Sequence, residues 1–123
     1  MPSAALNIIT ISFLVFIFVS ILISVNLMKY IIFNWKSYLN ISESMNLSKV
    51  VSKLPSTKKY KLISSPNNFY NLTLKSRYPK NIYAAQNIDL HGKGASTGSI
   101  DIQDLVSNKI KFCILGHSEV RSN

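Results

Sequence analysis

Polar and ionisable side chains follow three short apolar segments of this chain of 123 residues. Amide, ammonium, imidazole and carboxylate groups of this kind bind ligands and transfer protons. The residues are Asn34 and Lys36, Gln86 and Asn87, and His117 and Glu119. Their types predict a site but no particular reaction, because each residue taken singly is also consistent with a capping or solvent-exposed group.

Short apolar segments between amphipathic stretches predict the elements that position these residues. Four strands are expected, over Tyr30–Phe33, Tyr60–Ser64, Ile82–Asn87 and Ile110–Leu115. Strands that alternate with helices favour a parallel sheet built from βαβ units. In α/β barrels of this type, the reactive groups lie on loops after the carboxyl ends of the strands. The polar residues named above occupy such positions.

Three helices are expected between the strands. The first covers Ile41–Leu54, and an apolar spacing of i, i+3, i+4 and i+7 predicts its buried face. That face consists of Leu47, Val50, Val51 and Leu54. A second helix is expected over residues 67–77, with Phe69 and Leu72 facing inward. Asp101 is expected to cap a brief third helix that carries Ile102, Leu105 and Val106.

Four ordered motifs resemble the triosephosphate isomerase family. They are Phe33-Asn34-Trp35-Lys36, Ala84-Ala85-Gln86-Asn87, Gly94-Ala95-Ser96-Thr97-Gly98 and Gly116-His117-Ser118-Glu119. They occur with suitable gaps, and the resemblance covers residues 28–123. It implies an α/β fold that is the N-terminal half of a (β/α)₈ barrel, with about four strands.

The resemblance also implies a role for individual residues. Lys36 would hold the phosphate-bearing substrate and stabilise developing negative charge. His117 would polarise the substrate carbonyl as a neutral imidazole, a role for which this enzyme family is the standard example. Asn34 would bind near the substrate oxygen and orient Lys36, while Glu119 would support the basic residue and its loop. Thr97 would lie on the dimer loop that reaches into a neighbouring subunit.

The implied reaction is the interconversion of dihydroxyacetone phosphate and glyceraldehyde 3-phosphate in glycolysis and gluconeogenesis. It requires no metal and no cofactor, and the complete family member is expected to be a homodimer. The family's catalytic base is a glutamate on the strand-six loop, so we expect this chain to lack the base and to be inactive alone. Ser99 and Val120 stand where the family commonly has a glutamate and an arginine that pair across the dimer interface.

Charge and cysteine content restrict the alternatives. The net charge of +9 comes from 14 Lys and Arg against 5 Asp and Glu, which can indicate nucleic acid or an anionic membrane as a partner. The basic residues are scattered and no nucleic-acid motif accompanies them, so a solvated basic face is preferred. The single cysteine, Cys113, excludes an internal disulfide and is expected to be a small apolar core residue.

Residues 1–27 form a separate apolar segment, in which Leu6–Leu27 carries no charge. About 20 such residues suffice for a transmembrane helix. One interpretation is a start codon assigned too early, ahead of a cytoplasmic isomerase fragment that occupies residues 28–123. The other is a membrane anchor through residues 6–27, with the barrel part facing the cytoplasm, on a relic without catalytic activity.

Overall fold

Strands and helices alternate along the part of the chain that the computed structural model describes, which is residues 28–55, 57–89 and 94–121. In chain order the elements are β1 (Lys29–Asn34), α2 (Ile41–Val51), β2 (Tyr60–Ser65), the 3₁₀ turn η1 (Asn68–Tyr70), α3 (Asn71–Arg77), β3 (Ile82–Ala85), α4 (Ile102–Ser107), β4 (Phe112–Cys113) and α5 (Ser118–Arg121).

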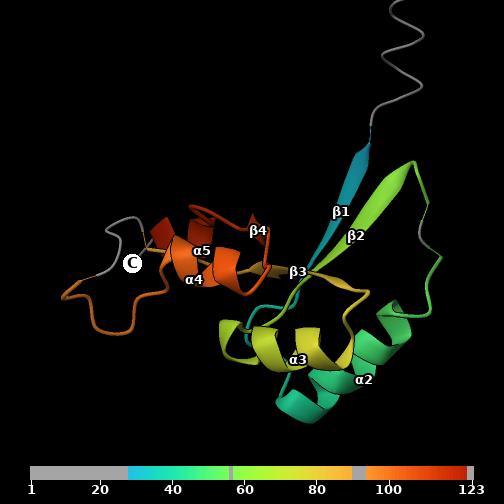
Figure 1. Ribbon diagram of the computed structural model, residues 1–123, viewed down its shortest axis with the longest axis horizontal. Coiled ribbons are helices and arrows are strands. Elements are labelled where there is room, and N and C mark those ends of the chain that lie inside the picture. The colour runs from blue at the N-terminus through green and yellow to red at the C-terminus, as the bar shows by residue number, and fades with distance from the viewer. Residues whose placement is uncertain (1–27, 56, 90–93, 122–123) are drawn as a thin grey trace, which may run out of the picture.

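The four strands form one parallel sheet in the order β1-β2-β3-β4. Lys29 pairs with Tyr60 and Asn34 with Ser65 at the two ends of the longest ladder. Helices α2 and α3 lie together on one side of the sheet, and α4 and α5 lie beside β4 (Figure 1). This half-barrel of parallel strands confirms the predicted α/β architecture. The fourth strand is shorter than expected, since only Phe112 and Cys113 pair with β3.

Helix α2 begins at a capping box. The Asn40 side chain accepts a hydrogen bond from the Glu43 backbone at 3.0 Å, and Glu43 accepts one from the Asn40 backbone at 2.9 Å. The predicted buried face is partly wrong: Leu47 packs against the core, but Val50 and Leu54 are exposed.

Two serines, Ser44 and Ser48, are the buried residues of α2. They are one turn apart and therefore lie on the same helix face. Their small side chains leave room for the ring of Tyr83, whose hydroxyl donates to the Ser48 hydroxyl at 3.1 Å. A large aromatic on the strand thus replaces the aliphatic contact that the helix pattern predicted.

Helix α3 starts later than the sequence predicts. Residues 68–70 form a 3₁₀ turn, in which the Asn67 side chain accepts from the Phe69 backbone. The α-helix itself therefore begins at Asn71. The buried residues of α3 are Asn71 and Leu74. The prediction that Phe69 and Leu72 face inward is wrong, because both are exposed.

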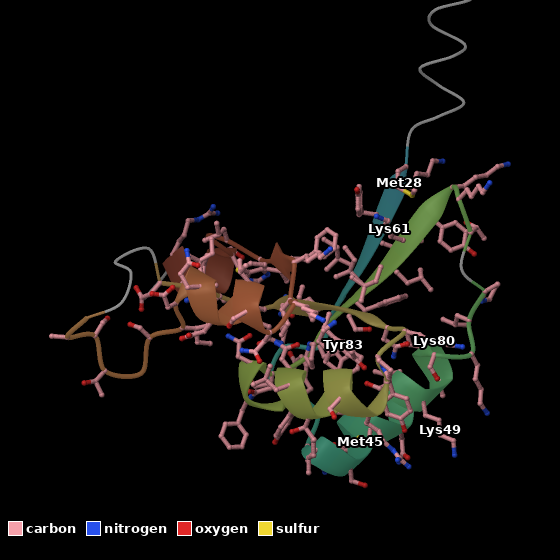
Figure 2. The ribbon with its side chains drawn as sticks, in the orientation of Figure 1. Met28, Met45, Lys49, Lys61, Lys80 and Tyr83 are labelled. Atoms are coloured by element: carbon pink, nitrogen blue, oxygen red, sulfur yellow. The ribbon has the colours of Figure 1, made fainter. Side chains whose placement is uncertain are left out.

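The core between sheet and helices contains Trp35, Leu74 and Tyr83. Figure 2 shows Tyr83 between the strands and the helical layer. Its hydroxyl accepts from the Asn81 amide at 3.2 Å and lies 3.4 Å from the Leu74 carbonyl. Burial raises the pKa of Tyr83. The phenol therefore stays protonated and joins α2, α3 and β3 by hydrogen bonds.

The prediction that Asp101 caps α4 is confirmed. The Asp101 side chain accepts from the Gln103 backbone at 2.6 Å. Ile102 and Val106 are exposed, so this short helix covers little of the sheet. Cys113 is half-buried and has no disulfide partner among the described residues. Burial raises the pKa of its thiol, which keeps it in the unreactive protonated form.

Strand β1 is at one edge of the sheet and is exposed on both faces. Four consecutive apolar residues are exposed: Tyr30, Ile31, Ile32 and Phe33. Parallel strands are ordinarily covered on both faces. The predicted apolar segment of residues 1–27 lies outside the described residues. Within the described ranges, no helix has both the length and the hydropathy needed to cross a membrane.

We expect Tyr83→Phe to lower the free energy of unfolding by about 1–2 kcal/mol, because the Ser48 hydroxyl loses a buried partner. Urea denaturation followed by circular dichroism measures the change. Tyr38→Phe is the matched control, since Tyr38 is 79% exposed. Equal stability of the two variants would contradict the structural role assigned to the Tyr83 hydroxyl.

Candidate active site

A cavity of about 200 Å³ lies at the carboxyl ends of the strands. Its walls come from the segments that follow all four strands. They comprise Asn34, Lys36, Ser37, Asn68, Gln86, Asn87, His117, Glu119 and Val120. The structure therefore brings together all six polar residues that the sequence singled out. Lys36 and Glu119, which are 83 positions apart in sequence, are in direct contact.

Lys36 has an unusual backbone conformation, with a φ of 50°. This left-handed region is disfavoured for residues with a Cβ atom. Two hydrogen bonds support it: the Asn34 side chain accepts from the Lys36 N–H at 3.0 Å, and the Gln86 amide donates to the Lys36 carbonyl at 2.8 Å. Such local strain is typical of functional sites. The backbone N–H and the backbone carbonyl of Lys36 are therefore each held by a neighbouring site residue.

The Lys36 ammonium forms an ion pair with Glu119, at 2.6 Å between Nζ and Oε1. The hydrogen bond and charge of Glu119 raise the pKa of Lys36, and the hydrogen bond from Lys36 lowers the pKa of Glu119. Both side chains are solvent-accessible, so their mutual attraction is screened. Lys36 is therefore a fully charged cation at neutral pH, held at the wall of the cavity.

His117 immediately precedes the short helix α5. Gly116 precedes it with a φ of 60°, a conformation that glycine adopts without strain. The His117 carbonyl accepts from the Val120 N–H at 2.9 Å. The ring Nδ1 accepts from the Glu119 N–H at 3.3 Å. In the neutral ring this assigns the proton to Nε2, which leaves that nitrogen as a donor.

Gln86 connects three of the segments that form the cavity. Its amide donates to Lys36 and also to the Ser65 carbonyl at 3.0 Å, while its backbone N–H donates to the Asn68 side chain at 2.7 Å. Asn68 was not singled out from the sequence. The rule that found the other site residues applies to it, because it follows the carboxyl end of β2.

Thr97, which the resemblance assigned to a dimer loop, does not line the cavity and is exposed between Gly94 and Gly98. Ser99 is bonded within the chain, since its hydroxyl donates to the Asp89 carboxylate at 2.6 Å. Val120 lies at the cavity wall and is exposed. Among the described residues, no three His, Cys, Asp or Glu side chains lie close enough to hold a metal ion.

The arrangement can bind an anion and donate a hydrogen bond next to it. Lys36 supplies the positive charge, and the His117 ring in its neutral form supplies the Nε2 donor. The Glu119 carboxylate is paired with Lys36 and has a lowered pKa. It is therefore a weak proton acceptor in this state and serves as a counter-charge for Lys36.

The ion pair predicts a defined pH dependence. The lowered Glu119 pKa gives a contribution to stability that is lost as pH falls through the folded-state pKa, below the ordinary range of a glutamate. The raised Lys36 pKa gives one that is lost as pH rises through its folded-state value. We expect Lys36→Gln to raise the Glu119 pKa toward its ordinary value, as measured by carboxyl NMR. Lys49→Gln is the control, and an equal Glu119 titration in both variants would contradict the pairing.

Comparison with known proteins gives a consistent result. The family model described as triosephosphate isomerase matches residues 29–123. A triosephosphate isomerase of Mycoplasma mobile is 31% identical over 100 residues, which are 76% of this chain and 41% of that protein. One of Flavobacterium psychrophilum is 38% identical over 93 residues, which are 72% of this chain and 37% of that protein.

The matched region begins at the first residue of β1 and includes every residue that lines the cavity. The chain spans about two fifths of the length of the curated relatives it matches. The family match, the parallel half-barrel and the cavity at the carboxyl ends of its strands agree with one another. This chain belongs to the triosephosphate isomerase family.

Proposed function

We propose that the cavity is the substrate-binding half of an isomerase site that interconverts dihydroxyacetone phosphate and glyceraldehyde 3-phosphate. The observation that carries the proposal is the convergence of Lys36 and His117 on one cavity, with both linked to Glu119. A triose phosphate combines an anion with a carbonyl group. The two side chains have complementary properties: Lys36 carries a permanent positive charge, and the neutral His117 ring donates a hydrogen bond.

In the proposed mechanism, Lys36 binds the anionic substrate and His117 acts on its carbonyl. A base removes a proton from the carbon next to the carbonyl, and negative charge then accumulates on the carbonyl oxygen. The Nε2–H group of His117 hydrogen-bonds that oxygen, which lowers the energy of the developing oxyanion. The proton of the adjacent hydroxyl group then passes to that oxygen, and the first proton returns to the former carbonyl carbon, so that the neighbouring carbon becomes the new carbonyl.

The base requires a carboxylate other than Glu119. The lowered pKa of Glu119 and its bond to Lys36 make it a poor proton acceptor. Family resemblance assigns the base to a glutamate on the strand-six loop, whereas the described residues form four strands. We therefore propose that residues 28–123 supply binding and polarisation, and that a complementary half-barrel supplies proton transfer.

Substrate binding also requires a change of partner for Lys36. Its Nζ now donates to Glu119 at 2.6 Å. An ammonium has three donors on a flexible stem, so it can turn toward a substrate anion while its backbone stays fixed. Asn34 and Gln86 hold that backbone, which supports a positioning role for both.

A polypeptide of residues 1–123 is expected to show no substantial isomerase turnover, because a positioned general base contributes about 10²–10⁴-fold in rate. A chimera that joins residues 28–121 to the C-terminal half of the Flavobacterium psychrophilum relative is expected to be active. A coupled assay with glyceraldehyde 3-phosphate measures both proteins. Turnover by the 123-residue polypeptide at the rate of the chimera would overturn the assignment of the base.

Within the active chimera, Lys36→Gln and His117→Gln are each expected to lower kcat/KM by about 10²-fold or more, since each removes stabilisation of charge. Lys49→Gln, on the exposed side of α2, should leave the rate unchanged and controls for the loss of one positive charge. A folded His117→Gln chimera with unaltered kcat would refute the proposed role of the imidazole.

A further inference from the structure

Five lysines from four segments border one cavity of about 420 Å³ at the opposite end of the sheet. One lies near the start of β2, one in α3, one before β3, and two between α4 and β4. They are Lys61, Lys75, Lys80, Lys109 and Lys111. We call this the lysine cavity. Ile82, Tyr83 and Phe112 contribute its apolar walls. Figure 2 labels Lys61 and Lys80, which come from the start of β2 and the turn before β3.

No carboxylate borders the lysine cavity. The chain has five acidic residues, all within the described ranges. Glu43 is in the α2 capping box, Asp101 caps α4, Asp89 accepts from Ser99, and Glu119 pairs with Lys36. The fifth, Asp104, is in the first turn of α4. Among the described residues, the five lysines therefore have no ion-pair partner at this cavity, and their charges repel one another.

The backbone conformation of Lys109 is a second, independent observation on the lysine cavity. Its φ is 58°, and it follows α4 at the position where helices usually place glycine. The Lys109 N–H donates to the Val106 carbonyl and the Ile110 N–H to the Leu105 carbonyl, both at 2.9 Å. This is the paired hydrogen bonding of a Schellman motif. A lysine here is less favourable than glycine for folding, and it contributes a fifth ammonium to the cavity.

We propose that the lysine cavity binds a compact anion carrying several phosphate groups. Lysine ammonium groups are phosphate ligands that act as point charges. Each phosphate monoester carries about −1.5 to −2 at neutral pH, so about three phosphates neutralise five lysines. A polyphosphate and the headgroup of a multiply phosphorylated lipid share this chemistry. A single triose phosphate leaves most of the positive charge uncompensated.

This site is separate from the candidate active site. The lysine cavity is at the amino-terminal ends of β2, β3 and β4, whereas Lys36 and His117 follow the carboxyl ends of the strands. The two cavities share no residue. The proposal therefore does not depend on isomerase activity, and either can fail without the other.

The test is calorimetric titration of sodium tripolyphosphate into the 123-residue chain and its variants. We expect Lys80→Gln combined with Lys111→Gln to weaken binding about tenfold, since each exposed charge contact contributes a few-fold. Lys49→Gln combined with Arg121→Gln removes the same charge from two residues that do not border the cavity, and should change the affinity by no more than about twofold. Equal losses in the two double variants would show general charge attraction and overturn the proposal.

Lys109→Gly separates binding from folding. Glycine suits the left-handed position, so the thermal midpoint of unfolding should rise or stay unchanged. The affinity for tripolyphosphate should fall about threefold. An unchanged affinity in this stable variant would exclude Lys109 from the site. Loss of tripolyphosphate binding in Lys36→Gln would show that the anion binds at the candidate active site, and would reject the lysine cavity as its binding site.

Vesicles identify the source of the phosphates. Binding to phosphatidylcholine vesicles with and without phosphatidylinositol bisphosphate is compared, so that any contribution from the apolar residues 6–27 is common to both. A phosphoinositide-dependent gain that disappears in Lys80→Gln with Lys111→Gln supports a lipid headgroup as the ligand. Tripolyphosphate binding without this gain supports a soluble anion. Absence of both kinds of binding refutes the proposal.

Discussion

The side-chain amide of Gln86 connects the strands at the end of the sheet where the candidate active site lies. It donates to the carbonyls of Lys36 and Ser65, which follow or end β1 and β2, from a position directly after β3. Parallel pairing brings the carboxyl ends of these three strands to one edge of the sheet. A single side-chain amide there donates to the backbone carbonyls of both Lys36 and Ser65. The left-handed turn at Lys36 depends on this bond and on the Asn34 side chain. The placement of the cation is thus determined by hydrogen bonds between strands and not by local preference.

The sequence predicted the elements and the site better than it predicted the packing. Strand positions followed from short apolar runs bounded by Pro, Gly and Asn, and the site residues followed from the position after each strand. The inward faces of α2 and α3 could not be read from periodicity. Tyr83 occupies the space next to α2, and the 3₁₀ turn at 68–70 shifts the phase of α3. Both effects are tertiary, since each depends on contacts with another element.

The two ends of the sheet differ in electrostatic character. At the carboxyl end, the charge of Lys36 is balanced by Glu119, so a ligand must compete with an existing partner. At the amino-terminal end, five lysines border a cavity without a carboxylate. Five of the 14 basic residues behind the net charge of +9 therefore border a single cavity, a grouping that the sequence did not indicate. Residues far apart in the chain create the cluster, and only the fold reveals it.

The order of strands in the sheet is also the order of strands in the chain. During synthesis on a ribosome, at about 5–20 residues per second, each new strand emerges after the neighbour with which it pairs. No strand has to insert between two that are already joined. The sheet can therefore grow by addition at one edge, with β1 as its template and α2 and α3 covering it in turn. Assembly of this half-barrel is thus compatible with vectorial folding from the amino terminus.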